Sequence, residues 1–536
     1  MKRHPNIARI VLATGMGLAC LAAAPAHGQT AAAPSPHRTL GTVNFPVTCS
    51  PAAQADFNHA MLLQHSFWYQ MAGESFRQVR QQDPGCTMAY WGEALTLLTN
   101  PYSPPSPQNL RQGKALLEEA QRIGTRSPRE AAYIEALAVL FAGDNPPGHR
   151  ARLTAYRDAM GRLHERFPDD KEAMIHYALL LGVASSPNDR SYADPLRGAA
   201  MLERELVLQP EHPGIVHYLI HLYDYPALAS RGVRAADRYG TLAADAPHAL
   251  HMPSHIYTRV GRWEDSVESN RRAAELALRN REPDDTLHAY DYMVYAYLQT
   301  GRDRAAREAM ERAISARFEG PTRNAYAFAM AAIPARFALE RGDWADAATL
   351  TPRAEPNFAY TEALTHFARA IGLSRSGRPM EATPDIEALA RIAQALQARD
   401  PYWSEQVAIQ REAAMGVQQF AAGQREDGLA TLRGAAEREG RTDKHVVTPG
   451  PLAPARELYA EALMEAGEPA RALTEFVAVQ VTEPRRFRAI LGAARAAEAA
   501  GQPDEARRHY AALVDVAGQA DGRRAELIAA RAYLAR

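Results

Sequence analysis

The segments VGRWEDSVESNRRAAE at 260–275 and TGRDRAAREAMERA at 300–313 show the pattern that decides the fold. In each, a helical stretch ends at a glycine, and a second stretch with small side chains follows it. Glycine accommodates the left-handed cap at the end of a helix, and small side chains let two helices approach closely. The pattern therefore predicts a helix hairpin that turns at the glycine.

The same pattern recurs to the end of the chain. Its glycines, at intervals of 34 to 46 residues, are Gly261, Gly301, Gly342, Gly377, Gly423, Gly467 and Gly501. Helix hairpins that repeat at about 34 residues are typical of tetratricopeptide repeats. No run of alternating apolar residues is long enough to predict a sheet. We therefore predict an all-α, tetratricopeptide-like α-solenoid, a superhelix of antiparallel helix pairs.

The composition is that of a globular protein, with 46% hydrophobic and 23% charged residues among 536. A net charge of −1 gives no reason to expect a nucleic-acid partner, because phosphate binders usually carry a basic excess. We predict a signal peptide at 1–28, an extended N-terminal segment at 29–55, a solenoid at 56–440 with a histidine-rich region at 176–291, and C-terminal repeats at 441–536. Within the N-terminal part we predict helices at 56–82, 88–99, 111–140, 150–166 and 170–185.

The first residues have the pattern of a secretory signal peptide. Three basic residues precede a short apolar stretch at 10–24, and Ala26-His27-Gly28 is a small-x-small cleavage site. The apolar stretch is too short for a comfortable span of about 20 residues, so we predict no membrane span. We expect a periplasmic or secreted protein. Lipidation of Cys20 is the alternative, although the residues before Cys20 fit a lipidation motif poorly.

Two cysteines remain after cleavage, Cys49 and Cys86. An even number of cysteines in an oxidising compartment favours a disulfide. The alternative is two unpaired, buried thiols.

Two histidine pairs mark the centre of the chain. His217 and His221 lie in HYLIH, and His251 and His255 lie in HMPSH. The i,i+4 spacing places both imidazoles of a pair on one face of a helix. Each histidine of the first pair precedes its counterpart in the second by 34 residues, so the pairs should occupy equivalent places on neighbouring repeats. Four imidazoles near one point would form a site for a transition metal.

Other residues extend this candidate site. The predicted metal ligands are His217, His221, His251, His255, His288 and Asp291. We expect Zn or Cu, and Fe less strongly, if a carboxylate joins two histidines. Asp224, like Asp291, is a candidate either for a ligand or for an acceptor of an imidazole N–H. His176 belongs to the same histidine series, and His65 is a further candidate.

Some residues near the pairs have simpler interpretations. His212 and His248 lie beside prolines and rank lower as ligands, because they have the pattern of loop or cap residues. Tyrosines crowd the same region and either pack or line a groove for an organic ligand. They are Tyr218, Tyr223, Tyr225, Tyr257, Tyr290, Tyr292 and Tyr295.

Two classes of function remain open. In the first, a metal site in the concave groove serves metal binding or metal-dependent chemistry. More than four ligands would then indicate storage or a two-metal centre, and three with an open position would indicate catalysis. In the second, the groove binds a protein or peptide partner and the histidines are structural. The sequence has no GxSxG, P-loop, HExxH or CxxC motif, so whether the protein is an enzyme stays open.

Four motifs give the chain a family resemblance. They are HSFWY (65–69) with CTMAYWGEA (86–94), HPGIVHYLIHLYDYPALA (212–229), HALHMPSHIYTRVGRWEDS (248–266) and VTPGPLAPARELYAEAL (447–463). The chain resembles a family of exported bacterial tetratricopeptide-repeat proteins over most of its mature length. The resemblance implies an α-solenoid outside the cytoplasm, but it implies no particular reaction or metal.

Overall fold

The structure is a computed structural model that describes residues 39–143, 148–186, 189–318 and 323–536. The predicted signal peptide at 1–28 lies outside these residues. The regular elements in the described ranges are all helices, and 74% of the chain is helical. The predicted all-α class is therefore confirmed. None of the helices in these ranges has the length and apolar character needed to cross a membrane.

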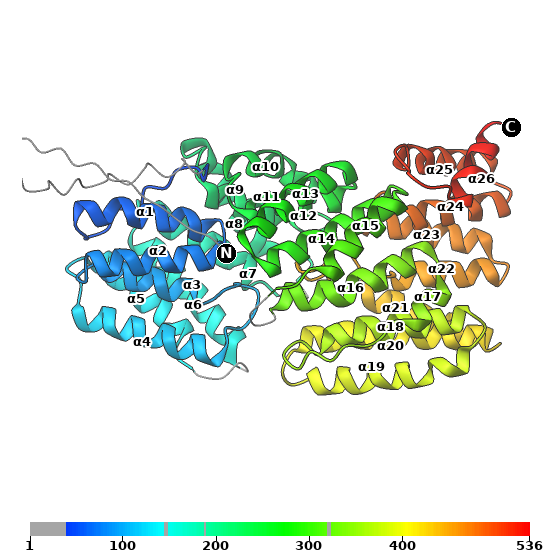
Figure 1. Cartoon of the computed structure of the whole chain (residues 1–536), viewed down its shortest axis with the longest axis horizontal. Coiled ribbons are helices and arrows are strands. Elements are labelled where there is room, and N and C mark those ends of the chain that lie inside the picture. Colours follow the sequence, from blue (N-terminus) through cyan, green and yellow to red (C-terminus); the bar gives the residue numbers. More distant parts are fainter. Residues whose placement is uncertain (1–38, 144–147, 187–188, 319–322) are drawn as a thin grey trace, which may run out of the picture. The chain divides into compact units, whose positions relative to one another are not determined.

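The helices form successive hairpins (Figure 1). The first helices of the hairpins, called A helices, are α1 (Pro51–His65), α3 (Thr87–Thr96), α5 (Pro128–Leu140), α7 (Lys171–Val183), α9 (Pro213–Tyr223), α11 (Pro247–His251) with α12 (Pro253–Val260), α14 (Pro283–Gln299), α16 (Asn324–Arg341), α18 (Tyr360–Arg375), α20 (Pro401–Ala421), α22 (Ala455–Glu465) and α24 (Phe487–Ala499). The second helices are α2 (Tyr69–Gln82), α4 (Pro107–Ile123), α6 (His149–Arg166), α8 (Ala193–Leu208), α10 (Ala229–Leu242), α13 (Trp263–Asn280), α15 (Asp303–Ser315), α17 (Trp344–Thr349), α19 (Thr383–Leu396) after the short 3₁₀ turn η2 (Pro379–Ala382), α21 (Arg425–Glu439), α23 (Pro469–Thr482) and α25 (Pro503–Val516), and α26 (Ala525–Leu534) follows them.

Contacts between the helices follow the order of the chain. Each helix packs on its hairpin partner and on the helix that follows, and many A helices also contact the next A helix, as α14 contacts α16 and α16 contacts α18. Contacts between nearest repeats are the defining feature of a solenoid. The tetratricopeptide-like solenoid predicted from the repeats is therefore confirmed.

The turn glycines behave as the repeat pattern predicts. All seven have positive φ, between 68° and 90°. Two features exclude a side chain at Gly261. Its φ is 71°, and a Cβ atom there would lie 2.9 Å from the carbonyl oxygen of Pro484. Only glycine tolerates both the left-handed conformation and this close approach.

The first helices differ from their predicted bounds. The helix predicted at 56–82 is two helices, α1 and α2, which separate where Phe67 takes φ of 52°. Helix α1 also begins five residues early, because the side chain of Ser50 caps it and Pro51 occupies its first position. The helix predicted at 111–140 is interrupted in the same way, because Ser127 caps a new helix, α5.

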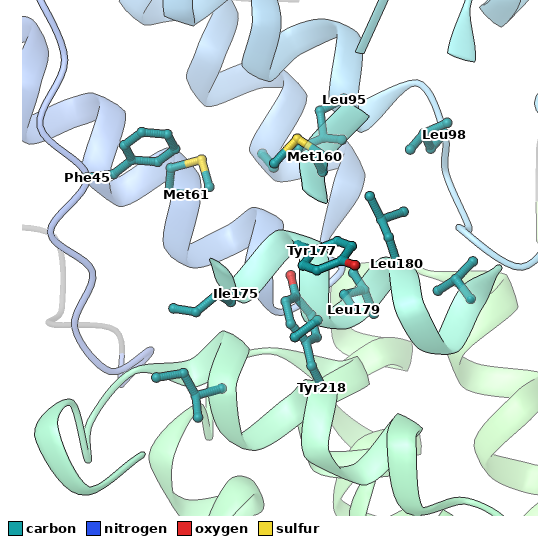
Figure 2. Packing of buried hydrophobic residues seen from close by; sticks show 14 of the residues in the cluster. Phe45, Met61, Leu95, Leu98, Met160, Ile175, Tyr177, Leu179, Leu180 and Tyr218 are labelled. Carbon is teal, nitrogen blue, oxygen red and sulfur yellow. The ribbon is translucent and has the colours of Figure 1, made fainter. Parts of the chain in front are cut away.

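Helix α7 is enclosed by its neighbours in the N-terminal half of the solenoid. Helices α6, α8 and α9 all contact α7, which is buried at every position after Lys171. Figure 2 shows Ile175, Leu179 and Leu180 of this helix among apolar side chains of its neighbours, with Tyr218 of α9 close by. Because α7 is enclosed, its polar side chains are cut off from bulk water. Glu172 accepts hydrogen bonds from His65 and His212, whereas Nδ1 of His176 has no hydrogen-bond partner among the described residues.

The two cysteines form a disulfide. Cys49 and Cys86 are bonded, with Cα atoms 4.8 Å apart. This agrees with the prediction that the two cysteines pair. The bond joins the extended segment before α1 to the start of α3.

Candidate metal centre

The two histidine pairs lie where the repeats predicted, on adjacent A helices. His217 and His221 are one turn apart on α9, and their Nε2 atoms are 3.1 Å apart. His251 ends α11, and His255 lies in the first turn of α12, which begins at Pro253. The Nε2 atoms of this second pair are 2.9 Å apart. Each pair therefore presents two imidazole nitrogens toward the same point.

The pairs belong to two groups of three rather than to one group of four. The first triad is His217, His221 and His248, and the second triad is His251, His255 and His288. Within each triad one ligand atom of every histidine lies within 4.8 Å of the others, a spacing that suits one metal ion. The structure thus brings together all five predicted histidines and adds His248, which the sequence ranked lower.

Hydrogen bonds orient three of these rings through Nδ1. The Nδ1–H of His217 donates to the carbonyl oxygen of His65 at 2.7 Å. His251 donates from Nδ1 to Oδ1 of Asn270 at 2.6 Å, and His255 donates from Nδ1 to Oδ2 of Asp224 at 2.9 Å. Partners of this kind fix the tautomer and the orientation of metal-binding histidines. In each case Nε2 is left unprotonated, with a lone pair that faces the Nε2 atom of the other histidine of its pair.

The surroundings favour neutral imidazoles. Burial lowers the pKa of His217, His221, His251 and His288 well below the usual value of 6.5, and neighbouring histidines lower it further. Burial also lowers the pKa of His255, although Asp224 opposes this effect. The neutral ring is the form that binds a metal ion.

The two aspartates near the site have different positions. Asp291 does not join either triad, because it accepts a hydrogen bond from Nε of Arg336 at 3.1 Å and both side chains are buried. Asp224 contacts the site through His255 and is also paired with Arg259 at 2.9 Å. Asp224 is therefore placed as an orienting acceptor rather than as a ligand.

A third group that includes two histidines has a different character. Nε2–H of His65 and of His212 donate to the two carboxylate oxygens of Glu172, at 3.0 and 2.9 Å. Nδ1 of His65 lies 2.9 Å from the hydroxyl of Tyr218, and Nδ1 of His212 accepts from the N–H of Ile215 at the start of α9. All four ring nitrogens are thus hydrogen-bonded, so this group is complete as a structural network.

Aromatic rings surround the first triad. Phe67 stacks on His221 and on His248, with ring centroids 5.5 Å apart in both cases. Tyr102, from the proline-rich loop before α4, lies 5.2 Å from His221. Sequence reasoning missed both residues. The HSFWY motif was the available signal for Phe67, and the structure shows that this residue takes a positive φ of 52° beside the site.

The segment between α21 and α22, residues 440–454, reaches the second triad. Tyr292, whose ring is 4.9 Å from His255, donates its O–H to the carbonyl oxygens of Val446 and Thr448, both at 3.2 Å. The buried ammonium of Lys444 lies 3.6 Å from Asp224. This segment therefore contacts Tyr292 and Asp224, which lie beside His255, and it brings a buried cation close to the second triad.

Solved structures match this chain only distantly. No protein-family model and no curated protein sequence matches the chain. A crystal structure of a tetratricopeptide repeat protein from Parabacteroides merdae is 12% identical and covers 54% of this chain and 97% of that one, with a TM-score of 0.29. The APC/C hetero-tetramer Cut9–Hcn1 is also 12% identical, covers 90% and 96% of the two chains and has a TM-score of 0.30. The human IFIT1 dimer with PPP-AAAA is 11% identical, covers 86% and 89%, and has a TM-score of 0.38. At these scores the matches assign neither a family nor a function.

Proposed function

We propose that this protein binds a first-row transition metal, Zn or Cu, through the histidines of its A helices. The protein would then be a helical-repeat metal-binding protein, in which the solenoid holds the ligands in place. The proposal covers metal binding or metal-dependent chemistry. Whether the protein is an enzyme stays open.

The observation that carries this proposal is the approach of His251 and His255. Their Nε2 atoms are 2.9 Å apart, and both Nδ1 atoms are committed as donors to Asn270 and Asp224. Each neutral ring therefore points an unprotonated lone pair at the other, an arrangement that is repulsive unless a cation lies between them. A proton is disfavoured there, because burial lowers the pKa of both rings. A metal ion would satisfy both lone pairs.

The donor set supports Zn or Cu. Imidazole nitrogen suits both ions, and Cu binds most strongly among the divalent first-row metals. Three histidines with an open fourth position is also a known arrangement for catalytic Zn. Fe is favoured less, since Asp291 is paired with Arg336 and Asp224 faces the Nδ1 side of His255.

We also propose that the chain works outside the cytoplasm. The pattern of residues 1–28 and the Cys49–Cys86 disulfide support this location, since disulfides persist in oxidising compartments.

A direct test uses the full chain after removal of metal with a chelator. The protein is incubated with Zn(II) or Cu(II), desalted, and analysed for bound metal. We expect the wild type to retain metal and His255→Gln to bind at least about tenfold more weakly. The matched control is His366→Gln, which alters a histidine paired with Asp385 on α19.

The second candidate function is a scaffold for a protein or peptide partner. It is supported by the repeat architecture, since solenoids commonly present extended binding surfaces. If the wild type retains neither metal, and His255→Gln lowers stability instead, the histidines are structural and this candidate replaces the first.

A further inference from the structure

The two triads form one continuous cluster. Ring centroids within a triad are 4.3 to 6.4 Å apart, and rings of different triads approach about as closely as the most widely separated rings within a triad. The centroids are 6.2 Å apart for His221 and His255 and 6.2 Å for His248 and His251, against 6.4 Å for His221 and His248 inside the first triad. Whatever binds one triad is therefore a near neighbour of whatever binds the other.

A single ion cannot use all six donors. Zn and its chemical relatives usually take four ligands from histidine sites, so one ion would leave at least two buried imidazole nitrogens unpaired. The donor atoms instead fall into two sets, and within each set the ligand atoms lie within 4.8 Å of one another. Two ions, each with three histidines, use every member of the cluster.

The triads are also alike in how they are exposed. Each has two buried histidines and one that is partly exposed, His248 in the first triad and His288 in the second. Nε2 of His248 is buried without a hydrogen-bond partner among the described residues. Each ion would thus be enclosed by the protein on the side of its two buried histidines. It would keep one coordination position for an external ligand.

The charge of the cluster indicates the class of that ligand. Neither triad contains a carboxylate, so two divalent ions would bring a charge of +4 against neutral donors. Among the carboxylates beside the cluster, buried Asp224 is already paired with Arg259 and lies 3.6 Å from Lys444, and partly exposed Asp285 lies 3.7 Å from Nδ1 of His248. A small anion, such as hydroxide, would lower the repulsion between two neighbouring ions.

We propose that the cluster is a two-metal centre, with one ion in each triad and a small anion shared between the ions. This inference rests on the proposed metal binding and specifies its stoichiometry and its ligand class. Paired ions that share an external ligand are the arrangement that two-metal sites use to act on a bound substrate.

The test uses Cu(II) as the probe on the full, metal-free chain. Bound copper is measured after desalting, and electron paramagnetic resonance counts the uncoupled spins. We expect two copper ions per wild-type chain, with a spin count well below two because a shared ligand couples the ions. His248→Gln and His288→Gln each remove one partly exposed ligand, so each should retain one ion with a full, uncoupled spin. The control is His445→Gln, a neighbouring histidine in neither triad, which should behave as the wild type does.

Each other outcome has a definite meaning. One copper ion in the wild type, lost in both variants, would overturn the two-metal centre and leave the proposed metal binding standing. Two ions with two full spins would overturn the shared anion. Two ions retained in both variants would place the copper outside the triads and overturn the inference. No bound copper or zinc at all would overturn the proposed function itself. Circular dichroism of each variant separates these results from unfolding.

Discussion

The carbonyl oxygen of His65 accepts a hydrogen bond from Nδ1 of His217 at 2.7 Å, although 152 residues separate the two in sequence. This contact depends on the break between α1 and α2. The break frees the carbonyl at the end of α1 and places Phe67, at φ of 52°, against the first triad. The N-terminal hairpin is thus part of the histidine site.

Asn270→Leu should weaken metal binding without unfolding the protein. The substitution keeps similar volume but removes the acceptor that holds Nδ1 of His251 at 2.6 Å. Loss of such an orienting partner typically costs 10–100-fold in metal affinity, on the order of 1–3 kcal/mol. A competition titration with a chelating dye measures the change. Asn280→Leu, at the exposed end of the same helix, is the control, and equal affinities for the two variants would contradict the orienting role of Asn270.

His176→Gln should reduce the acid sensitivity of the metal-free protein. Burial lowers the pKa of His176 to about 3 in the folded state, against about 6.5 when unfolded. The unfolded chain therefore takes up this proton first, and stability present above pH 6.5 is lost as the pH falls toward 3. The contribution at pH 4.5 is on the order of 2–3 kcal/mol. Urea unfolding across pH 7 to 4.5 should give a shallower decline for the variant, whereas parallel curves would show that His176 does not titrate in this way.

Arg486→Met should be strongly destabilising. The fully buried guanidinium of Arg486 donates to Glu457 at 2.7 and 2.9 Å and to Glu340 at 2.5 Å. Removing the cation leaves buried Glu340 without this partner and leaves Glu457 with Arg488 at 3.4 Å, and breaking a buried ion pair in this way costs about 3–5 kcal/mol. Arg471→Met, which removes an exposed ion pair with Glu468, should change the free energy of unfolding by less than about 1 kcal/mol. Chemical denaturation followed by circular dichroism compares the two, and similar losses would rule out a special role for the buried network.

Reduction of the Cys49–Cys86 disulfide should destabilise the N-terminal hairpins. The bond closes a loop of 37 residues, and constraint of such a loop in the unfolded chain contributes about 3–4 kcal/mol. We expect the wild type to lose stability on addition of dithiothreitol, and Cys49→Ala to be insensitive to it. The same response to reductant in both proteins would argue against the disulfide.

The predictable parts of the structure are those that local chemistry determines. The turn glycines were visible because a left-handed cap needs glycine at one position in each repeat. The two histidine pairs were visible because the helical period and the repeat length place them on adjacent A helices. Both inferences need only spacing along the chain.

The unpredictable parts depend on how distant helices meet. His248 ranked low beside Pro247, yet this proline begins α11 and the ring lies 5.1 Å from His217 of α9. Asp291 follows His288 by three residues on α14, but Arg336 of α16 pairs with it. Lys444 lies in a segment without helical periodicity, so its approach to Asp224 had no signal in the sequence.

The most direct test of the central claim compares the metal content of the purified full chain with that of a variant that lacks His217 and His251. The wild type, loaded with Zn(II) or Cu(II) and desalted, should carry stoichiometric metal. The paired substitution His217→Ala and His251→Ala removes one histidine from each triad and should abolish stoichiometric metal binding. The helical content should stay nearly the same, because stability in a solenoid is spread over many repeats. A wild type that never holds metal, together with a double variant that unfolds, would contradict a metal centre and show that the histidines serve the fold.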